Sequence, residues 1–235
     1  MTTNTDIDTA CIPREIALQA AMFRLGNVDE EIKAGYEILR KYHKTVTIFG
    51  SARTPIDSQY YHAAKETAEK LAAKGYAVVS GGGHGIMSAA NEGANIAVQK
   101  GAREAGGESI AFNIKLPHEQ TLNAYAIESY EFQHFSPRKI VMTLYAEAYL
   151  FFPGGFGTLD ELMEILTLIQ TKKTVKVPVI LYGTDFWGDL DAFIKKHMVD
   201  GQKTVSPGDE LIYTLTDNVD QIIELVENSN VYCKH

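Results

Sequence analysis

Three short apolar segments of this chain are each followed by glycine within two residues, and helical periodicity resumes after each turn. The segments cover residues 46–49, 77–80 and 148–152. Continuously apolar strands that alternate with helices are typical of a parallel sheet covered on both faces. The sequence therefore predicts an α/β fold, a single-domain Rossmann-like doubly wound parallel sheet with helices on both faces. In such sheets ligands bind beyond the carboxyl ends of the strands, where the three glycine turns would lie.

Further segments continue this alternation. The spacing of apolar residues predicts helices at 14–42, 60–74, 86–99, 159–171, 187–199 and 219–227, and strands at 109–113, 177–181 and 211–213. Ser136 before Pro137 is typical of a helix N-cap followed by proline at the first helical position, so we expect a helix from there to about Glu147. Residues 115–135 are expected to form a long loop, and such loops often line binding sites.

The length of 235 residues is sufficient for one large α/β domain with a substantial core, and no linker interrupts the chain. We expect residues 1–13 to form a flexible tail. Residues 14–235 are expected to form a single Rossmann-like nucleotide-binding domain with an N-terminal helical extension.

Composition argues against several classes of function. The net charge is −8, whereas a general nucleic-acid binder needs a basic face. The first residues lack the basic start and apolar core of a signal peptide, and no apolar run approaches the ~20 residues of a membrane span. The cysteines, Cys11 and Cys233, lie outside any CxxC motif, as expected for reduced thiols. We therefore expect a cytoplasmic protein whose partners include neither nucleic acid nor a membrane.

The segment Pro153–Glu161, with the sequence PGGFGTLDE, places three glycines and a hydroxyl between a strand and a helix. A turn of this kind aims backbone N–H groups and the positive end of a helix dipole at one point, which favours binding of an anion, usually phosphate. The sequence therefore predicts a phosphate site at this turn. By contrast, residues 81–85 do not match GxGxxG, and neither a P-loop nor a GxSxG motif is present.

Charged residues near this turn have two interpretations each. Thr158 and Glu161 fit a capping box, in which the glutamate only bonds the helix N-terminus, but Glu161 could instead be catalytic if it faces the sugar rather than the phosphate. Arg138 and Lys139 lie in the first turn of a predicted helix, where the helix dipole disfavours cations. They are either solvated charges or functional residues. The histidines show no metal-ligand spacing, so neither a metal nor another cofactor is expected.

These motifs together resemble the LONELY GUY (LOG) family, also labelled "lysine decarboxylase-like". Pro153–Glu161 matches the family motif PGGxGTxxE, and Ile48–Arg53 and Ser80–Met87 resemble its first two strands and turns. Arg138 and Lys139 stand where the family has an Arg-Lys pair. The resemblance covers about residues 30–227. The N-terminal extension, the stretch 99–107 and the spacing of the loop LPHEQ depart from the compact plant pattern and are similar to the longer bacterial branch.

The resemblance implies hydrolysis of the N-glycosidic bond of nucleoside 5′-monophosphates, AMP or N6-modified AMP, to a free base and ribose 5-phosphate. It implies Arg138 and Glu161 as catalytic residues, no cofactor, and a homodimer or an assembly of dimers. The substrate-binding residues that it implies are Ser51, Met87, Glu119, Lys139, Gly155, Phe156, Gly157, Thr158 and Thr167.

Two other functions remain open from the sequence. A non-catalytic nucleotide sensor or carrier would keep the glycine turn but would not need Arg138 together with Glu161. A decarboxylase would need pyridoxal phosphate on a lysine, for which Lys172 and Lys173 are available, but no framework for that cofactor is visible.

Overall fold

The computed structural model describes residues 14–116 and 121–229. The strands are β1 (Thr45–Phe49), β2 (Ala77–Ser80), β3 (Glu108–Ile114), β4 (Glu128–Phe132), β5 (Ala148–Phe151), β6 (Val179–Tyr182) and β7 (Tyr213–Thr216). The α-helices are α1 (Arg14–Leu39), α2 (Gln59–Ala73), α3 (Ile86–Gln99), α4 (Phe135–Thr143), α5 (Phe156–Gln170), α6 (Thr184–Phe193) and α7 (Val219–Glu227). The helical segments η1 (Ala102–Ala105), η2 (Ile194–Gly201) and η3 (Asp209–Leu211) complete the described elements.

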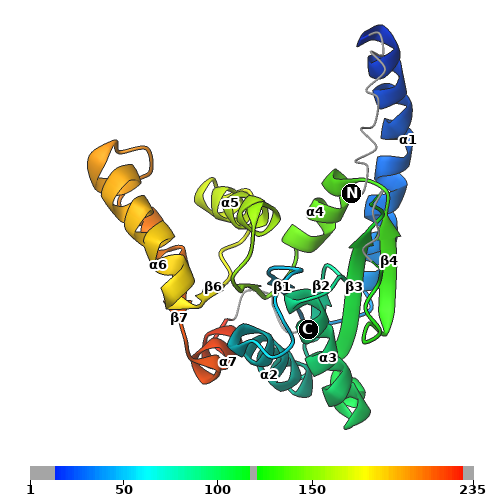
Figure 1. The fold of residues 1–235 in the computed structure, drawn as a ribbon. Helices are drawn as coiled ribbons and strands as arrows, with labels where there is room; N and C mark the ends of the chain where they lie inside the picture. Colours follow the sequence, from blue (N-terminus) through cyan, green and yellow to red (C-terminus); the bar gives the residue numbers. More distant parts are fainter. Residues whose placement is uncertain (1–13, 117–120, 230–235) are drawn as a thin grey trace, which may run out of the picture.

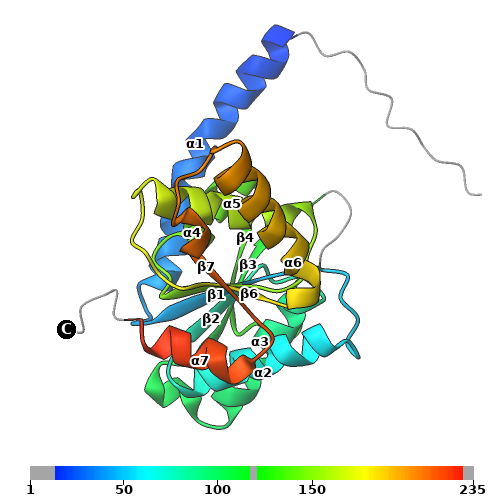
Figure 2. The same cartoon turned by 90° about the vertical axis from the view of Figure 1, so that its left-hand side faces the viewer.

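The seven strands form one parallel sheet with the order β4-β3-β2-β1-β5-β6-β7. One hydrophobic cluster packs α2, α3 and α7 against one face, and a second packs α1, α4, α5 and α6 against the other. Both layers are visible in Figures 1 and 2, where the first half of α1 projects beyond the body. The predicted α/β doubly wound parallel sheet is confirmed.

The direction of the chain reverses between β1 and β5. From β1 the chain proceeds outward through β2 and β3 to β4, whereas from β5 it proceeds through β6 to β7 on the other side. β1 and β5 themselves are paired in register, Phe49 beside Phe151. Crossover helices therefore leave this pair in opposite directions, which opens a crevice beyond its carboxyl ends. The turns after β1 and β5 both enter that crevice.

Strand β4 lies inside the stretch that was expected to be a loop, so that expectation was wrong for residues 128–132. β4 pairs only with β3, at the edge of the sheet, and its residues are alternately more and less exposed. An edge strand with one solvent-exposed face lacks the continuous apolar run by which the other strands were recognised.

Helix α4 begins one residue before Ser136, so the expected N-cap at Ser136 was wrong. The cap position is His134, whose side chain makes no capping bond. The carboxylate of Glu31, in α1, instead accepts hydrogen bonds from the backbone N–H groups of Gln133 and His134, at 3.1 and 3.3 Å. Because this acceptor comes from about a hundred residues away, local sequence could not reveal it.

Other boundaries also differ from the sequence expectation, among them the end of α4 at Thr143 rather than near Glu147. Pro178 has no N–H for the ladder, and β6 begins only after it. The strand expected at 211–213 begins at Tyr213, because the residues before it form η3. Helix α6 begins at Thr184 and continues as η2, a π-helix. Among the described residues, no helix is both long and apolar enough to cross a membrane.

Gly188 lies inside α6, and a Cβ added there would contact nothing within 4 Å. Alanine loses less backbone entropy than glycine when a helix forms. Gly188→Ala is therefore expected to raise the free energy of unfolding by roughly 0.5–1 kcal/mol. Urea titration followed by circular dichroism measures the change, and a lower midpoint for the variant would contradict the expected open space.

Candidate active site

Backbone hydrogen bonds fasten the three glycine turns to one another. The N–H of Ser51 donates to the carbonyl of Pro153 at 3.0 Å, and the N–H of Ile86 donates to the carbonyl of Ser51 at 3.0 Å. Gly85 has a φ of +60°, and a Cβ there would lie 2.2 Å from the Ser51 carbonyl oxygen. Only glycine meets both conditions, so this residue lets the second turn approach the first. The three turns form one connected floor.

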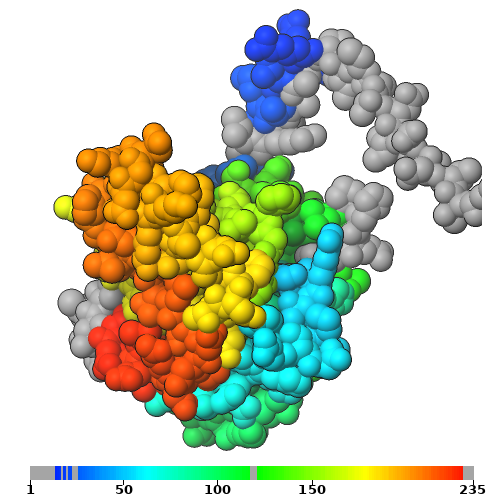
Figure 3. Space-filling view, turned by 60° about the vertical axis from the view of Figure 1, so that its left-hand side comes forward, coloured from blue at the N-terminus to red at the C-terminus, as the bar shows by residue number. Residues whose placement is uncertain are grey.

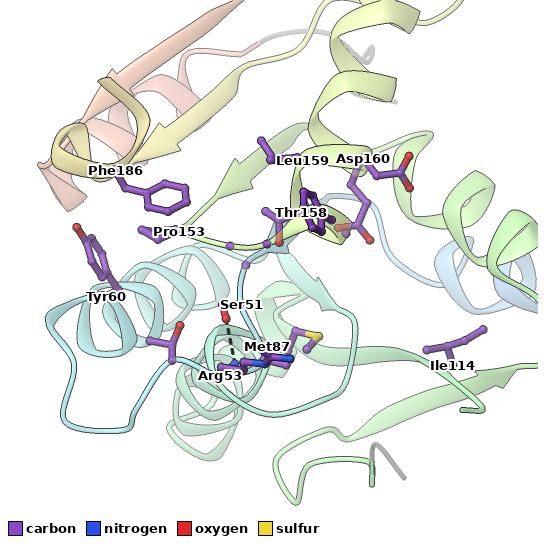
Figure 4. Close-up of a pocket in the computed structure, with 18 of the residues that line it drawn as sticks. Ser51, Arg53, Tyr60, Met87, Ile114, Pro153, Thr158, Leu159, Asp160 and Phe186 are labelled. Atoms are coloured by element: carbon purple, nitrogen blue, oxygen red, sulfur yellow. Dashed lines mark hydrogen bonds between the residues drawn. The ribbon is translucent and has the colours of Figure 1, made fainter. Parts of the chain in front are cut away.

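A cavity of about 990 Å³ opens above this floor, at the carboxyl edge of β1 and β5 (Figure 4). Its rim includes the start of α2 and the start of α6, which are joined by a hydrogen bond from Tyr60 to Asp185. In Figure 3 these two segments meet on the surface as cyan and yellow patches. The cavity brings together most of the residues expected from the sequence: Ser51, Met87, Arg138, Lys139, Gly155, Phe156, Gly157, Thr158 and Glu161.

Two expected residues are not placed there. Glu119 lies outside the described residues. Thr167 is exposed on α5, donates to the Met163 carbonyl at 2.7 Å, and is not among the described residues that line the cavity. Contact of either residue with a substrate stays a prediction.

The N-terminus of α5 faces the cavity without a side-chain cap. Its cap residue is Gly155, and no described side chain bonds this end. The first backbone bond of the helix runs from Leu159 to Gly155, at 3.0 Å. The preceding N–H groups, those of Phe156 to Thr158, therefore have no partner within the helix. Phe156 is 93% exposed, so its ring does not cover them. Uncapped amides at the positive end of a helix dipole suit a phosphate.

The capping-box interpretation of Thr158 and Glu161 is excluded. Helix α5 begins at Phe156, so Thr158 lies within its first turn rather than at the cap, and it is buried. Glu161 follows in the second turn, and one of its carboxylate oxygens lies 4.0 Å from Nη1 of Arg138. Glu161 is thus part of an ion pair that lines the cavity.

Burial governs the ionisation of this pair. Removal from water raises the pKa of Glu161 to about 7, although Arg138 opposes the shift. The same burial lowers the pKa of Arg138 below its usual value. A carboxyl group that titrates near neutral pH, beside a buried guanidinium, is an arrangement often found at catalytic sites.

Besides its pair with Glu161, Arg138 is held in place by two neighbouring segments. Its Nε donates to the carbonyl of Phe112, at the middle of β3, at 2.7 Å. A Cβ at Gly81 would lie 2.3 Å from Nη2 of Arg138 and 2.6 Å from Sδ of Met87, so the second glycine turn packs directly on the guanidinium. The residue is 8% exposed. The alternative that Arg138 is a solvated surface charge is therefore wrong.

Lys139 joins α4 to α5. Its ammonium lies 2.9 Å from a carboxylate oxygen of Asp160 and 2.8 Å from one of Glu164. Burial lowers the pKa of Lys139, but the bonds to these carboxylates outweigh it and raise the pKa above its usual value. The lysine therefore remains charged and fixes the helix that carries Glu161 against the helix that carries Arg138.

A buried polar network that was not expected from the sequence lies beneath the second glycine turn. The side chain of Asn123 donates to Oδ1 of Asn91 at 2.8 Å, and Ser80 donates to the same oxygen at 2.7 Å. The backbone N–H of Asn123 donates to the carbonyl of Gly82 at 2.8 Å. These bonds fasten the chain after residue 120 to the turn that packs on Arg138. Polar residues that are distant in sequence carried no local signal of this contact.

The described residues contain no group of three or more His, Cys, Asp or Glu side chains that could hold a metal ion.

Comparison with known proteins places this chain in a family. A sequence model of the family described as "Possible lysine decarboxylase" matches residues 96–226. The chain belongs to this family. It is also 30% identical over 184 residues to the cytokinin riboside 5′-monophosphate phosphoribohydrolase of Mycobacterium marinum, covering 77% of this chain and 91% of that one. The resemblance to LOG proteins that was drawn from the motifs is confirmed.

Plant members of the LOG family are similar over the same length. The cytokinin riboside 5′-monophosphate phosphoribohydrolase LOG2 of Arabidopsis thaliana is 30% identical over 189 residues, which cover 78% of this chain and 83% of the plant protein. Among solved structures, TM1055 superposes with a TM-score of 0.55 at 25% identity, covering 78% of this chain and 98% of that one. The molybdenum cofactor carrier protein of Chlamydomonas reinhardtii superposes with a TM-score of 0.52 at 21% identity, covering 78% and 96%. The latter shows a shared fold alone.

Proposed function

We propose that this LOG-family protein hydrolyses the N-glycosidic bond of nucleoside 5′-monophosphates and releases a free base and ribose 5-phosphate. One observation carries the proposal. The uncapped N-terminus of α5, suited to a phosphate, opens into the same cavity as the buried pair of Arg138 and Glu161. A protein that only binds a phosphate would need the uncapped helix end but not the buried pair of Arg138 and Glu161.

In this mechanism the 5′-phosphate lies on the amides of Phe156 to Thr158, and its binding orients the ribose. Water adds to C1′ as the bond from C1′ to the base nitrogen breaks. The bonding electrons leave with the base, which takes up a proton, and the water loses one. Carboxylates stabilise the oxocarbenium-like sugar of such a transition state and position the attacking water. Glu161, in its ionised form, takes this role.

Arg138 lets phosphate and carboxylate occupy one cavity. A carboxylate next to a phosphate would repel it, but the guanidinium of Arg138 lies beside Glu161 and offsets part of that charge. The relatives whose names specify cytokinin riboside 5′-monophosphates support a purine monophosphate, AMP or N6-modified AMP, as the substrate class.

Purified protein incubated with a panel of purine and pyrimidine monophosphates tests the proposal. We expect chromatography to show free base and ribose 5-phosphate in equal amounts, with adenine-type nucleotides cleaved fastest. A protein that binds AMP but releases no base from any member of the panel would instead be a nucleotide sensor or carrier on this fold.

The decarboxylase chemistry suggested by the family's description does not fit the cavity. Pyridoxal phosphate needs a lysine whose pKa is lowered, so that the neutral amine can form a Schiff base. Lys139 is the lysine among the described lining residues, and its two carboxylate partners raise its pKa instead. Lys172 and Lys173 follow α5 and are not among the described residues that line the cavity.

A further inference from the structure

The cavity contains a cationic side chain that the mechanism above does not use. Three cations line it, and two of them are engaged: Arg138 with Glu161, and Lys139 with the carboxylates of α5. The third is Arg53, in the turn after β1. Its side chain is exposed and, within residues 14–116 and 121–229, forms neither an ion pair nor a hydrogen bond.

The backbone of Arg53 is nevertheless firmly placed. Its N–H donates to Oγ of Ser51 at 3.0 Å, and the N–H of Ser51 donates to the carbonyl of Pro153 at 3.0 Å. The turn that carries Arg53 is thus bonded to the residue directly before the phosphate turn. Figure 4 shows Arg53 beside Ser51 and Met87, with Thr158 across the cavity. A fixed backbone with an unengaged guanidinium can bind a ligand without first breaking a bond.

Charge balance shows why the site needs this cation. Among the described lining residues, the carboxylates of Asp160 and Glu161 offset the charges of Arg138 and Lys139. A phosphate dianion at the N-terminus of α5 would therefore meet only the partial charge of the helix dipole, about half an elementary charge. Arg53 supplies the surplus positive charge that these pairs do not.

We propose that Arg53 binds the 5′-phosphate of the substrate and sets the preference of the site for nucleotides over nucleosides. The inference rests on the proposed function for the identity of the ligand. Guanidinium binds phosphate through two parallel hydrogen bonds, a geometry that a lysine ammonium cannot reproduce. Arg53 is thus a specificity residue, and Glu161 remains the group at the reacting carbon.

Isothermal titration calorimetry with ribose 5-phosphate tests Arg53 without requiring turnover. Arg53→Ala is expected to weaken binding by about 10- to 100-fold, the usual effect of losing a charge-assisted hydrogen bond. Arg53→Lys should retain part of the affinity. The control Arg40→Ala removes an exposed arginine of the chain that pairs with Glu37 and is absent from the cavity, so it should bind like the wild type. Affinity for adenosine should be unchanged in all three variants.

Three results would overturn the inference. The first is a ribose 5-phosphate affinity unaffected by Arg53→Ala, and the second is an equal loss of affinity for adenosine, which would indicate a general distortion of the cavity. A wild-type protein with no affinity for ribose 5-phosphate would also overturn it. If the wild type binds ribose 5-phosphate in an Arg53-dependent way but cleaves no nucleotide, the inference stands and the proposed hydrolase function fails.

Discussion

Replacing Glu161 with glutamine is expected to lower the rate of base release from AMP by about 10²–10⁴-fold, the usual range for loss of a catalytic carboxylate. Glutamine has nearly the same shape but cannot carry the negative charge that stabilises an oxocarbenium-like sugar. Binding of AMP should persist, because the amides at the start of α5 do not depend on this side chain. Stopped assays for free adenine measure the first quantity, and calorimetric titration with AMP measures the second.

Glu224→Gln is the matched control for this variant. Glu224 lies exposed on α7, on the opposite face of the sheet from α5, and does not line the cavity. It should cleave AMP at the wild-type rate. Full activity in Glu161→Gln would show that the carboxylate is not required, and the assignment of Glu161 would then be wrong.

The Glu161→Gln variant should also become more stable than the wild type at alkaline pH. Burial raises the pKa of Glu161 to about 7 in the folded chain, against 4.5 for a solvated glutamate. Between these pH values the folded state binds more protons than the unfolded state, so the free energy of unfolding falls as pH rises. Glutamine mimics the protonated form and avoids this loss. The difference should approach about 3 kcal/mol above pH 7 and vanish below pH 4.5, as urea titrations across this range would show.

Gly81→Ala is expected to lower kcat/KM for AMP by about 100-fold with little loss of stability. The new methyl group would overlap Nη2 of Arg138 and Sδ of Met87. Both are terminal side-chain atoms rather than backbone, so the overlap is relieved by shifting the guanidinium from the position that its bond to Phe112 sets. The fold survives such a shift, but a displacement of about 1 Å at a catalytic group typically costs that much in rate. Steady-state kinetics should therefore show a large fall in kcat/KM, whereas the thermal midpoint should change little.

Gly188→Ala provides the matched glycine substitution, because its methyl group enters open space away from the cavity. It should leave the kinetics unchanged. If Gly81→Ala were as active as the wild type, the position of the Arg138 guanidinium would not matter for turnover. If Gly81→Ala unfolded instead, the turn rather than the arginine would be the sensitive element. Gly82→Ala is the reference for such a loss of stability, because alanine is strained at the φ of +74° that Gly82 adopts.

Local sequence predicted the parts of this structure that depend on local chemistry. The buried strands β1, β2 and β5 were recognisable as apolar runs, and the turn at Pro153–Glu161 was recognisable by its glycines. Because parallel strands end at one edge, the sequence also predicted that the three turns would lie at that edge. The backbone bonds between Ser51, Pro153 and Ile86 show that the turns also contact one another there.

Contacts between distant segments could not be predicted in the same way. The capping box at Thr158 and Glu161 was a valid local pattern, yet α5 begins earlier and Glu161 pairs with Arg138 from another helix. The start of α4 was misplaced because its cap comes from Glu31. In both cases a tertiary partner decided between local alternatives, and only the folded chain contains that partner.

The carboxylate of Glu31 connects the N-terminal helix α1 to the start of the helix that carries Arg138. It is 4% exposed and also contacts Nδ1 of His134 at 2.8 Å, so the N-terminal extension closes the end of the helix on which Arg138 stands. A chain shortened past this residue would keep every described group that lines the cavity, yet the start of the helix that carries Arg138 would lose the hydrogen bonds that Glu31 accepts. Helix α1 therefore helps to hold the helix that carries Arg138.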